Sequence, residues 1–126
     1  MTDTAAMLAL AERLCTAIET ADVATLKKLY APNAEIWMNT TNRAMPARDV
    51  TAFLPHLAKK VANRRYVDRQ VRAFDDGFVQ RHRLIGTRND GATVSVLACI
   101  VCTVENGLVT RVEEYCDSAQ LKSFLG

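Results

Sequence analysis

Three turn signals in the second half of the chain limit its fold more than any other feature. Each joins acidic or amide residues to a following glycine, and they are Asp75-Asp76-Gly77, Asn89-Asp90-Gly91 and Glu105-Asn106-Gly107. Asparagine, aspartate and glycine tolerate the positive φ values of tight hairpin turns. Apolar and polar residues alternate between these turns, which predicts strands at residues 65–74, 78–88, 92–104 and 108–116. The second half is therefore predicted to form an antiparallel meander.

The first half instead has helical periodicity. Apolar side chains recur every three or four residues from Met7 to Ile18, and Thr4 is suited to cap this first helix. Asp22 is suited to cap a second, short helix, which the Pro32-Asn33 pair would end.

A third helix is expected to open at Pro46, after a short strand at residues 34–39 and an irregular polar segment at 40–45. Its buried face would carry Val50, Phe53, Leu54, Leu57 and Val61. Pro55 either kinks this helix or marks where it begins. With a last short helix at 118–125, the prediction is a single α+β domain over residues 1–126, in which three N-terminal helices pack on a sheet.

Composition indicates one domain with its own hydrophobic core and argues against a dedicated nucleic-acid binder. The 126 residues are 49% hydrophobic, enough for one core without metal or disulfide support, and the net charge is only +2. Arginines cluster between residues 64 and 88, but Asp68, Asp75 and Asp76 are interleaved with them. This mixture favours a solvated sheet face over a nucleic-acid surface, which stays a weaker alternative.

The four cysteines, at positions 15, 99, 102 and 116, are expected to be buried free thiols in a reducing cytoplasm. Cys99 and Cys102 have a zinc-like spacing, but positions three apart in a strand point to opposite faces. We therefore expect free thiols, no metal site and no organic cofactor. No signal peptide, transit peptide or membrane span is recognised, so a cytoplasmic location is expected.

The strand after Gly91 predicts a partner. From Thr93 to Val104 it is almost wholly apolar, so both of its faces need cover. The helices can cover one face, and we expect a second subunit on the other, giving a homodimer formed sheet to sheet.

The candidate chemistry lies at His82 and Glu114. Alternation places Phe78, Gln80, His82, Leu84 and Gly86 on one face of their strand, with Arg81 and Arg83 opposite. In the last strand it groups Leu108, Thr110, Val112, Glu114 and Cys116. An imidazole and a carboxylate in one dry hollow would form an acid/base unit for proton transfer or water activation. A satisfied structural histidine, or a register slip that exposes Glu114, are the alternatives.

Four segments resemble known proteins: residues 29–34, 36–39, 47–54 and 105–117. Their order along the chain and their amino-acid sequences resemble the SnoaL-like and limonene epoxide hydrolase branch of a superfamily. That superfamily includes nuclear transport factor two and ketosteroid isomerase. The resemblance covers nearly the whole chain. It implies a cone-shaped, cystatin-like barrel with a curved, mixed but mainly antiparallel sheet, enclosing a small-molecule cavity.

The resemblance also assigns positions. The epoxide hydrolases hold the attacking water with an aromatic-x-Asn pair, here Trp37 and Asn39, and place a basic residue and an acid in the second meander strand, here His82 and Leu84. Leu84 cannot protonate an epoxide oxygen. Their water-activating acid corresponds to Glu114.

Two of these positions have a second interpretation. In the SnoaL-type polyketide cyclases of the same branch the base corresponds to a further position, Asp117, which could instead cap the last helix. Asn39 could equally be a turn residue.

The predicted function is acid/base chemistry on a small, mostly hydrophobic molecule, of the isomerase, dehydratase, hydrolase or cyclase type. His82 and Glu114 would exchange protons, while Trp37, Asn39, Phe53, Leu57, Gln80 and Leu84 would contact the substrate. A non-catalytic ligand-binding or assembly domain of the same fold is the alternative.

Overall fold

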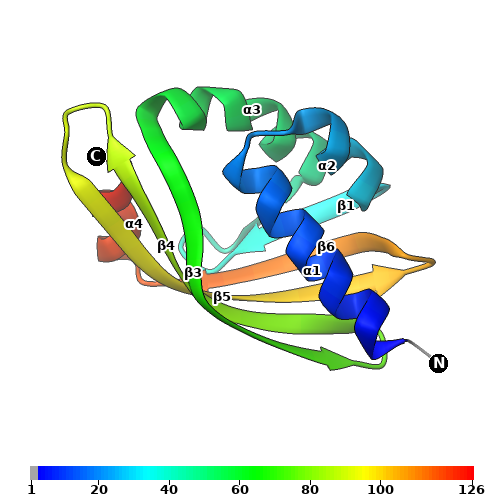
Figure 1. The fold of residues 1–126 in the computed structure, drawn as a ribbon. Coiled ribbons are helices and arrows are strands. Elements are labelled where there is room, and N and C mark those ends of the chain that lie inside the picture. The colour runs from blue at the N-terminus through cyan, green and yellow to red at the C-terminus, as the bar shows by residue number, and fades with distance from the viewer. Residues whose placement is uncertain (1–2) are drawn as a thin grey trace.

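One curved sheet with helices on its concave face forms the molecule (Figure 1). The computed structural model describes residues 3–126. Its helices are α1 (Thr4–Glu19), α2 (Val23–Leu29), α3 (Ala47–Lys60) and α4 (Ser118–Leu125). Its strands are β1 (Tyr30–Met38), β2 (Arg43–Pro46), β3 (Val61–Phe74), β4 (Gly77–Arg88), β5 (Thr93–Glu105) and β6 (Leu108–Cys116). The strand order is β2-β1-β6-β5-β4-β3. The predicted α+β class is confirmed, although the sheet does not close into a barrel.

The sheet is mixed, as predicted. β3 to β6 form the antiparallel meander, β1 pairs with β6 in parallel, and β2 pairs antiparallel with β1. The turn at Asn106 and Gly107 has positive φ at both residues, 51° and 78°, as a two-residue hairpin turn needs. β2 was not predicted, because its four residues are all exposed and carry no alternation.

The helices form a layer above the sheet, and α4 lies at one end of it (Figure 1). The main core lies between α1, α2 and the concave sheet face and includes Leu14, Leu26, Phe78 and Ile100. A smaller cluster joins Phe124 of α4 to Val61, Val94 and Val96. Members of both clusters line the cavity described below.

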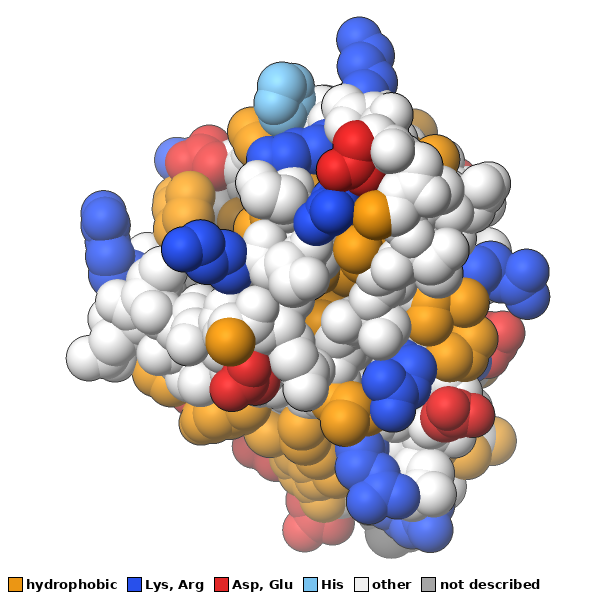
Figure 2. Space-filling view, turned by 90° about the vertical axis from the view of Figure 1, so that its left-hand side faces the viewer, with side chains coloured by type: hydrophobic (Ala, Val, Ile, Leu, Met, Phe, Trp, Pro, Cys, Tyr) orange, Lys and Arg blue, Asp and Glu red, His pale blue; other side chains and the backbone are white. Residues whose placement is uncertain are grey.

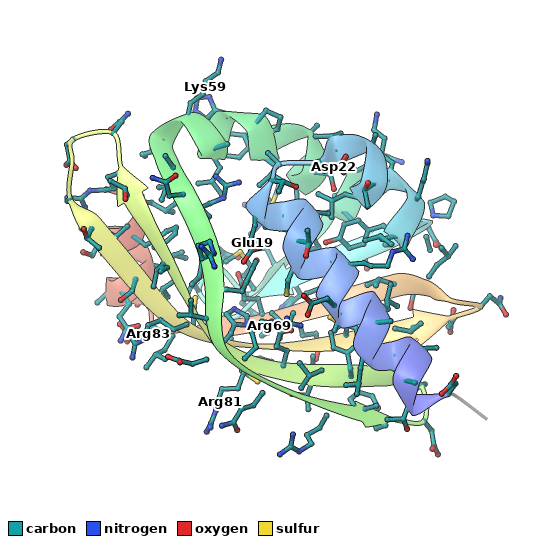
Figure 3. The ribbon with its side chains drawn as sticks, in the orientation of Figure 1. Glu19, Asp22, Lys59, Arg69, Arg81 and Arg83 are labelled. Atoms are coloured by element: carbon teal, nitrogen blue, oxygen red, sulfur yellow. The ribbon has the colours of Figure 1, made fainter. Side chains whose placement is uncertain are left out.

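Two bulges bend β3 and change which side chains face inward. They fall between Ala62 and Arg65 and between Val67 and Gln70, and each contains a residue with φ of 55°, Asn63 or Asp68. A bulge adds one residue to a strand, so the alternation shifts by one position. Arg64 is consequently buried and Arg69 partly buried, which corrects their placement on a solvated arginine face. Figure 3 shows Arg69 on the side of α1, while Arg81 and Arg83 lie on the opposite side of the sheet.

Several local predictions need smaller corrections. Asp3, not Thr4, caps α1, because its carboxylate accepts from the backbone N–H of Ala5 at 3.0 Å. An irregularity where β5 pairs with β6 turns Val109 into the core in place of Leu108. Pro55 lies inside α3, which is one continuous helix.

Candidate functional site

A cavity of about 460 Å³ lies between the helices and the concave face of the sheet. Most of its wall is apolar. The apolar lining residues come from every layer of the fold and are Leu14, Ile18, Leu26, Ile36, Met38, Met45, Val50, Phe53, Leu54, Leu57, Leu84, Val96, Ala98, Ile100, Val112, Leu121, Phe124 and Leu125. In Figure 2, hydrophobic side chains also lie at the floor of a furrow in the surface on the side where α4 ends the sheet. A cavity of this size and character suits a small, mostly hydrophobic molecule.

Few polar groups interrupt this wall. They are Tyr30, Thr40, Thr41, Arg43, Thr51, Arg64, Tyr66, His82, Glu114 and Cys116. Glu114 is the single carboxylate among the lining residues of the described chain, and His82 is the single imidazole. Any proton transfer to or from a molecule in the cavity therefore has few candidate groups.

His82 projects inward from β4 and is only 2% exposed. Its Nδ1 lies 2.9 Å from the Gln80 amide nitrogen, and Tyr66 meets its ring edge-on with centroids 4.7 Å apart. Burial, assisted by the positive charge of Arg69, lowers the pKa of His82 to about 4. The imidazole is therefore neutral at physiological pH.

Glu114 projects from β6 into the same cavity. Within residues 3–126 its carboxylate accepts no hydrogen bond and forms no ion pair, and burial raises its pKa above the ordinary value of 4.5. Burial also raises the pKa values of Tyr30 and Tyr66, and the nearby Glu114 charge adds to both effects. Both phenols are therefore protonated hydrogen-bond donors beside a carboxyl group that holds its proton more strongly than usual.

The direct His82–Glu114 pair that the sequence suggested is not formed. β5 lies between β4 and β6, and Ile100 pairs with Gln80 on one side and with Glu114 on the other. Two inter-strand spacings of about 4.8 Å each separate the two strands. A molecule in the cavity could contact both groups, but the groups do not contact each other.

Gln80 lies behind His82 and does not line the cavity. It is fully buried, and its oxygen accepts from Nε of Arg69 at 3.2 Å. The thiol of Cys15 lies against the same amide, at 3.3 Å from the nitrogen. The structure therefore moves Gln80 from the predicted substrate contacts to the support of His82.

Trp37 and Asn39 also lie outside the cavity wall. Ile36 and Met38 face inward, so Trp37 faces outward, where its ring lies 5.3 Å from that of Tyr115. Asn39 is exposed and ties the end of β1 to β6, since its amide exchanges two hydrogen bonds with the backbone of Cys116, at 2.9 and 3.1 Å. This geometry matches the interpretation of Asn39 as a turn residue, directly after β1.

Three of the remaining predicted residues line the cavity, and Asp117 caps a helix instead. Phe53, Leu57 and Leu84 lie on the cavity wall, and Phe53 is also 58% exposed. Asp117 caps α4 by accepting from the backbone N–H of Gln120 at 2.9 Å.

Comparisons with known proteins agree with this architecture. The SnoaL-like domain family matches residues 11–112, which is most of the chain. The chain belongs to the SnoaL-like domain family. No curated protein matches its sequence.

Solved structures with the fold of this SnoaL-like domain differ widely in sequence. The protein Bal32a from a soil-derived mobile gene cassette is 21% identical, with a TM-score of 0.82 over 99% of this chain and 100% of that one. An NTF2-like protein from Burkholderia xenovorans is 16% identical, with a TM-score of 0.81 over the whole of both chains. An LEH-like epoxide hydrolase from M. tuberculosis is 15% identical, with a TM-score of 0.79 over 98% and 92%. At these identities the likeness shows the fold and not the activity.

The SnoaL-like domain has functional candidates that the sequence did not reveal. Tyr30, Arg64 and Tyr66 all line the cavity. The second predicted helix, ended by the Pro32-Asn33 pair, would have included Tyr30, whereas Tyr30 is the first residue of β1. Asparagine at position 63 was the one available signal for the bulge that buries Arg64, because asparagine tolerates positive φ.

No helix within 3–126 is long and apolar enough to cross a membrane. No group of three or more His, Cys, Asp or Glu side chains in that range is arranged to hold a metal ion.

Proposed function

We propose that this domain catalyses acid/base chemistry on a small, mostly hydrophobic organic molecule, without a metal or organic cofactor. The observation that carries the proposal is the Glu114 carboxyl group, which lies on an apolar cavity wall without a hydrogen-bond partner in the described chain. Isomerisation, dehydration, hydration and cyclisation are the reaction types that such a site suits. The proposal includes a cytoplasmic location and no nucleic-acid partner.

The chemistry follows from the environment of Glu114. A carboxyl group with a raised pKa is a stronger base when ionised and a usable acid when protonated, so one residue can remove a proton and return it elsewhere. Tyr30, Tyr66 and His82 line the same cavity and can donate hydrogen bonds to charge that develops on substrate oxygen. The direct proton exchange between His82 and Glu114 is not part of the proposal.

A generic proton-abstraction substrate tests this role without knowledge of the natural one. In 5-nitrobenzisoxazole a base removes the ring-carbon proton, the N–O bond breaks, and a coloured cyanophenolate forms. We expect measurable turnover that rises with pH as Glu114 ionises. Glu114→Gln should lower kcat/KM by about 10²–10⁴-fold, the range typical of a general base.

Glu113→Gln is the matched control. Its side chain belongs to the other face of β6, where it pairs with Arg111 at 3.1 Å, so turnover should be unchanged. Equal rates for wild type and Glu114→Gln would contradict the proposal. If the compound binds to the wild type and no turnover is detected, the alternative of a non-catalytic ligand-binding domain is favoured.

We also propose a homodimer formed through the outer face of the sheet. Leu97 and Tyr115 are 47% and 43% exposed there, beside Trp37. Large apolar side chains grouped on one face favour association. Light scattering should give twice the monomer mass for the wild type and the monomer mass for Leu97→Glu, whereas a monomeric wild type would contradict this proposal.

A further inference from the structure

A chain of four side chains leads from the surface to the cavity. Glu12 of α1 forms an ion pair with Nη1 of Arg69, and Nε of Arg69 donates to Oε1 of Gln80 at 3.2 Å. Nε2 of Gln80 then lies 2.9 Å from Nδ1 of His82. Figure 3 shows Arg69 reaching from β3 toward α1, the helix that carries Glu12, the first of these four side chains.

These hydrogen bonds between side chains determine which atom of each group carries a proton. A guanidinium can only donate hydrogen bonds, so the Gln80 atom that faces Arg69 is the oxygen and the atom that faces His82 is the NH₂ group. Nδ1 of His82 must then accept. A neutral imidazole that accepts at Nδ1 carries its one proton on Nε2.

Two other protonation states of His82 are disfavoured: the tautomer with its proton on Nδ1, and the charged imidazolium. A proton on Nδ1 would bring two donors together at 2.9 Å, and a charged ring would lie near Arg69 in a site with little water. The other groups around the ring are the edge of Tyr66 from β3, the thiol of Cys15 behind Gln80, and Glu114 across the cavity on β6. In the described chain none of them accepts a hydrogen bond from Nε2–H.

We propose that His82 is a hydrogen-bond donor that stays neutral at physiological pH, fixed by Gln80 and Arg69, and that the cavity binds an uncharged molecule whose carbonyl oxygen accepts from its Nε2–H. The first half stands on its own, and the second rests on the proposed function. Gln80 and Arg69 are positioning residues in this arrangement.

The donor-rich wall explains the choice of a carbonyl group. Tyr30, Tyr66 and Nε2–H of His82 are all donors, and Glu114 is the single carboxylate among the described lining residues. A carbonyl oxygen can accept two such hydrogen bonds. The proton next to the carbonyl is the one that Glu114 would remove, and the resulting enolate oxygen would be stabilised by the same donors. A neutral donor performs this role throughout the physiological pH range.

Nitrogen-15 NMR of the imidazoles tests the first half in the wild-type protein. The chain has two histidines, and His56 is exposed on α3, so it provides the internal reference. We expect His82 to show a protonated Nε2 and a bare Nδ1 from pH 5.5 to 8, as about 1.5 pH units or more above a pKa near 4 requires. A proton on Nδ1, or titration of His82 near pH 6.5, would overturn it.

Gln80→Glu separates positioning from mere packing. The side chain keeps its shape, but a carboxylate near Nδ1 accepts instead of donating. We expect the His82 tautomer to move to Nδ1–H and its pKa to rise. A purely structural role for Gln80 predicts an unchanged tautomer, and that result would contradict the inference.

A matched ligand pair tests the second half. 2-Acetylnaphthalene has a carbonyl acceptor, and 2-isopropenylnaphthalene has nearly the same planar shape with a CH₂ group in place of the oxygen. The wild type should bind the ketone about tenfold more tightly by calorimetry, a difference of about 1.4 kcal/mol, and His82→Phe should abolish the preference. No preference in the wild type would overturn the carbonyl assignment.

The outcomes separate this inference from the proposed function. An Nε2–H tautomer with an inactive Glu114 leaves the donor role of His82 intact and removes the enzyme. Activity that depends on Glu114, together with a protonated Nδ1 on His82, would support the proposed function and overturn the donor role of His82.

Discussion

Tyr66 presents its ring to His82 edge-on, with the centroids 4.7 Å apart and the planes at 87°. Gln80 holds the same imidazole at Nδ1 from within β4. Between them these contacts leave the His82 ring little freedom and little water. A charged imidazolium loses its hydration there, which is the main reason for its lowered pKa.

The lowered pKa of His82 makes the fold sensitive to acid. Between pH 6.5 and about 4 the unfolded chain binds a proton at this residue that the folded chain does not. Its contribution to stability is therefore fully present above pH 6.5 and falls as the pH approaches 4, by up to about 3 kcal/mol. Urea unfolding at pH 7 and pH 4.5 should show a smaller loss for His82→Gln than for the wild type. His56→Gln should behave as the wild type, and parallel losses in all three proteins would contradict the prediction.

Ionisation of Glu114 should lower the stability of the fold as the pH rises, whereas His82 lowers it as the pH falls. Its raised pKa means that the folded chain keeps a proton that the unfolded chain releases above pH 4.5. The free energy of unfolding therefore falls as the pH rises from 4.5 through the folded pKa. Glu114→Gln removes this loss, so it should gain stability relative to the wild type between pH 4.5 and pH 8 in urea titrations. Glu113→Gln should show no such gain, and a gain of equal size there would count against the assignment.

The sequence predicted those faces of the sheet where a strand runs without interruption. In β4 the residues Phe78, Gln80 and His82 are buried, as strict alternation requires. Alternation cannot show a bulge, because a bulge depends on one residue adopting positive φ. Asn63 and Asp68 do so in β3, and the inward positions of Arg64 and Arg69 follow from them.

Pairing between distant strands is the other information that the sequence lacked. The sequence predicts Trp37 as a substrate contact, but the parallel pairing of β1 with β6 sets Ile36 and Met38 inward and Trp37 outward. The separation of His82 from Glu114 has the same origin. Each faces the cavity as predicted, but the position of β5 between their strands is a property of the whole sheet.

Arg64 should be important for stability rather than for chemistry. Its guanidinium donates to the carbonyls of Ile18 and Glu19 at the end of α1, at 2.8 and 3.2 Å, and to Val61 at 2.9 Å. Arg64→Met would remove these three charge-assisted hydrogen bonds, at a cost of about 2–4 kcal/mol in the free energy of unfolding. Exposed Arg65 is the neighbouring control, and Arg65→Met should cost less than about 0.5 kcal/mol. Similar losses for both variants in urea unfolding would show that Arg64 does not hold the end of α1.

Phe124 should determine how well α4 closes its end of the cavity. It is 2% exposed, packs in a cluster with Val61, Val94 and Val96, and also lines the cavity. Phe124→Ala should destabilise the protein by about 3–5 kcal/mol, because the vacated volume adjoins an existing cavity and cannot collapse fully. Phe74→Ala removes the same side chain from a site that is 41% exposed, so thermal unfolding should show a smaller loss. If α4 instead contributes little to the cavity wall, the two variants will unfold alike and 2-acetylnaphthalene will bind Phe124→Ala as it binds the wild type.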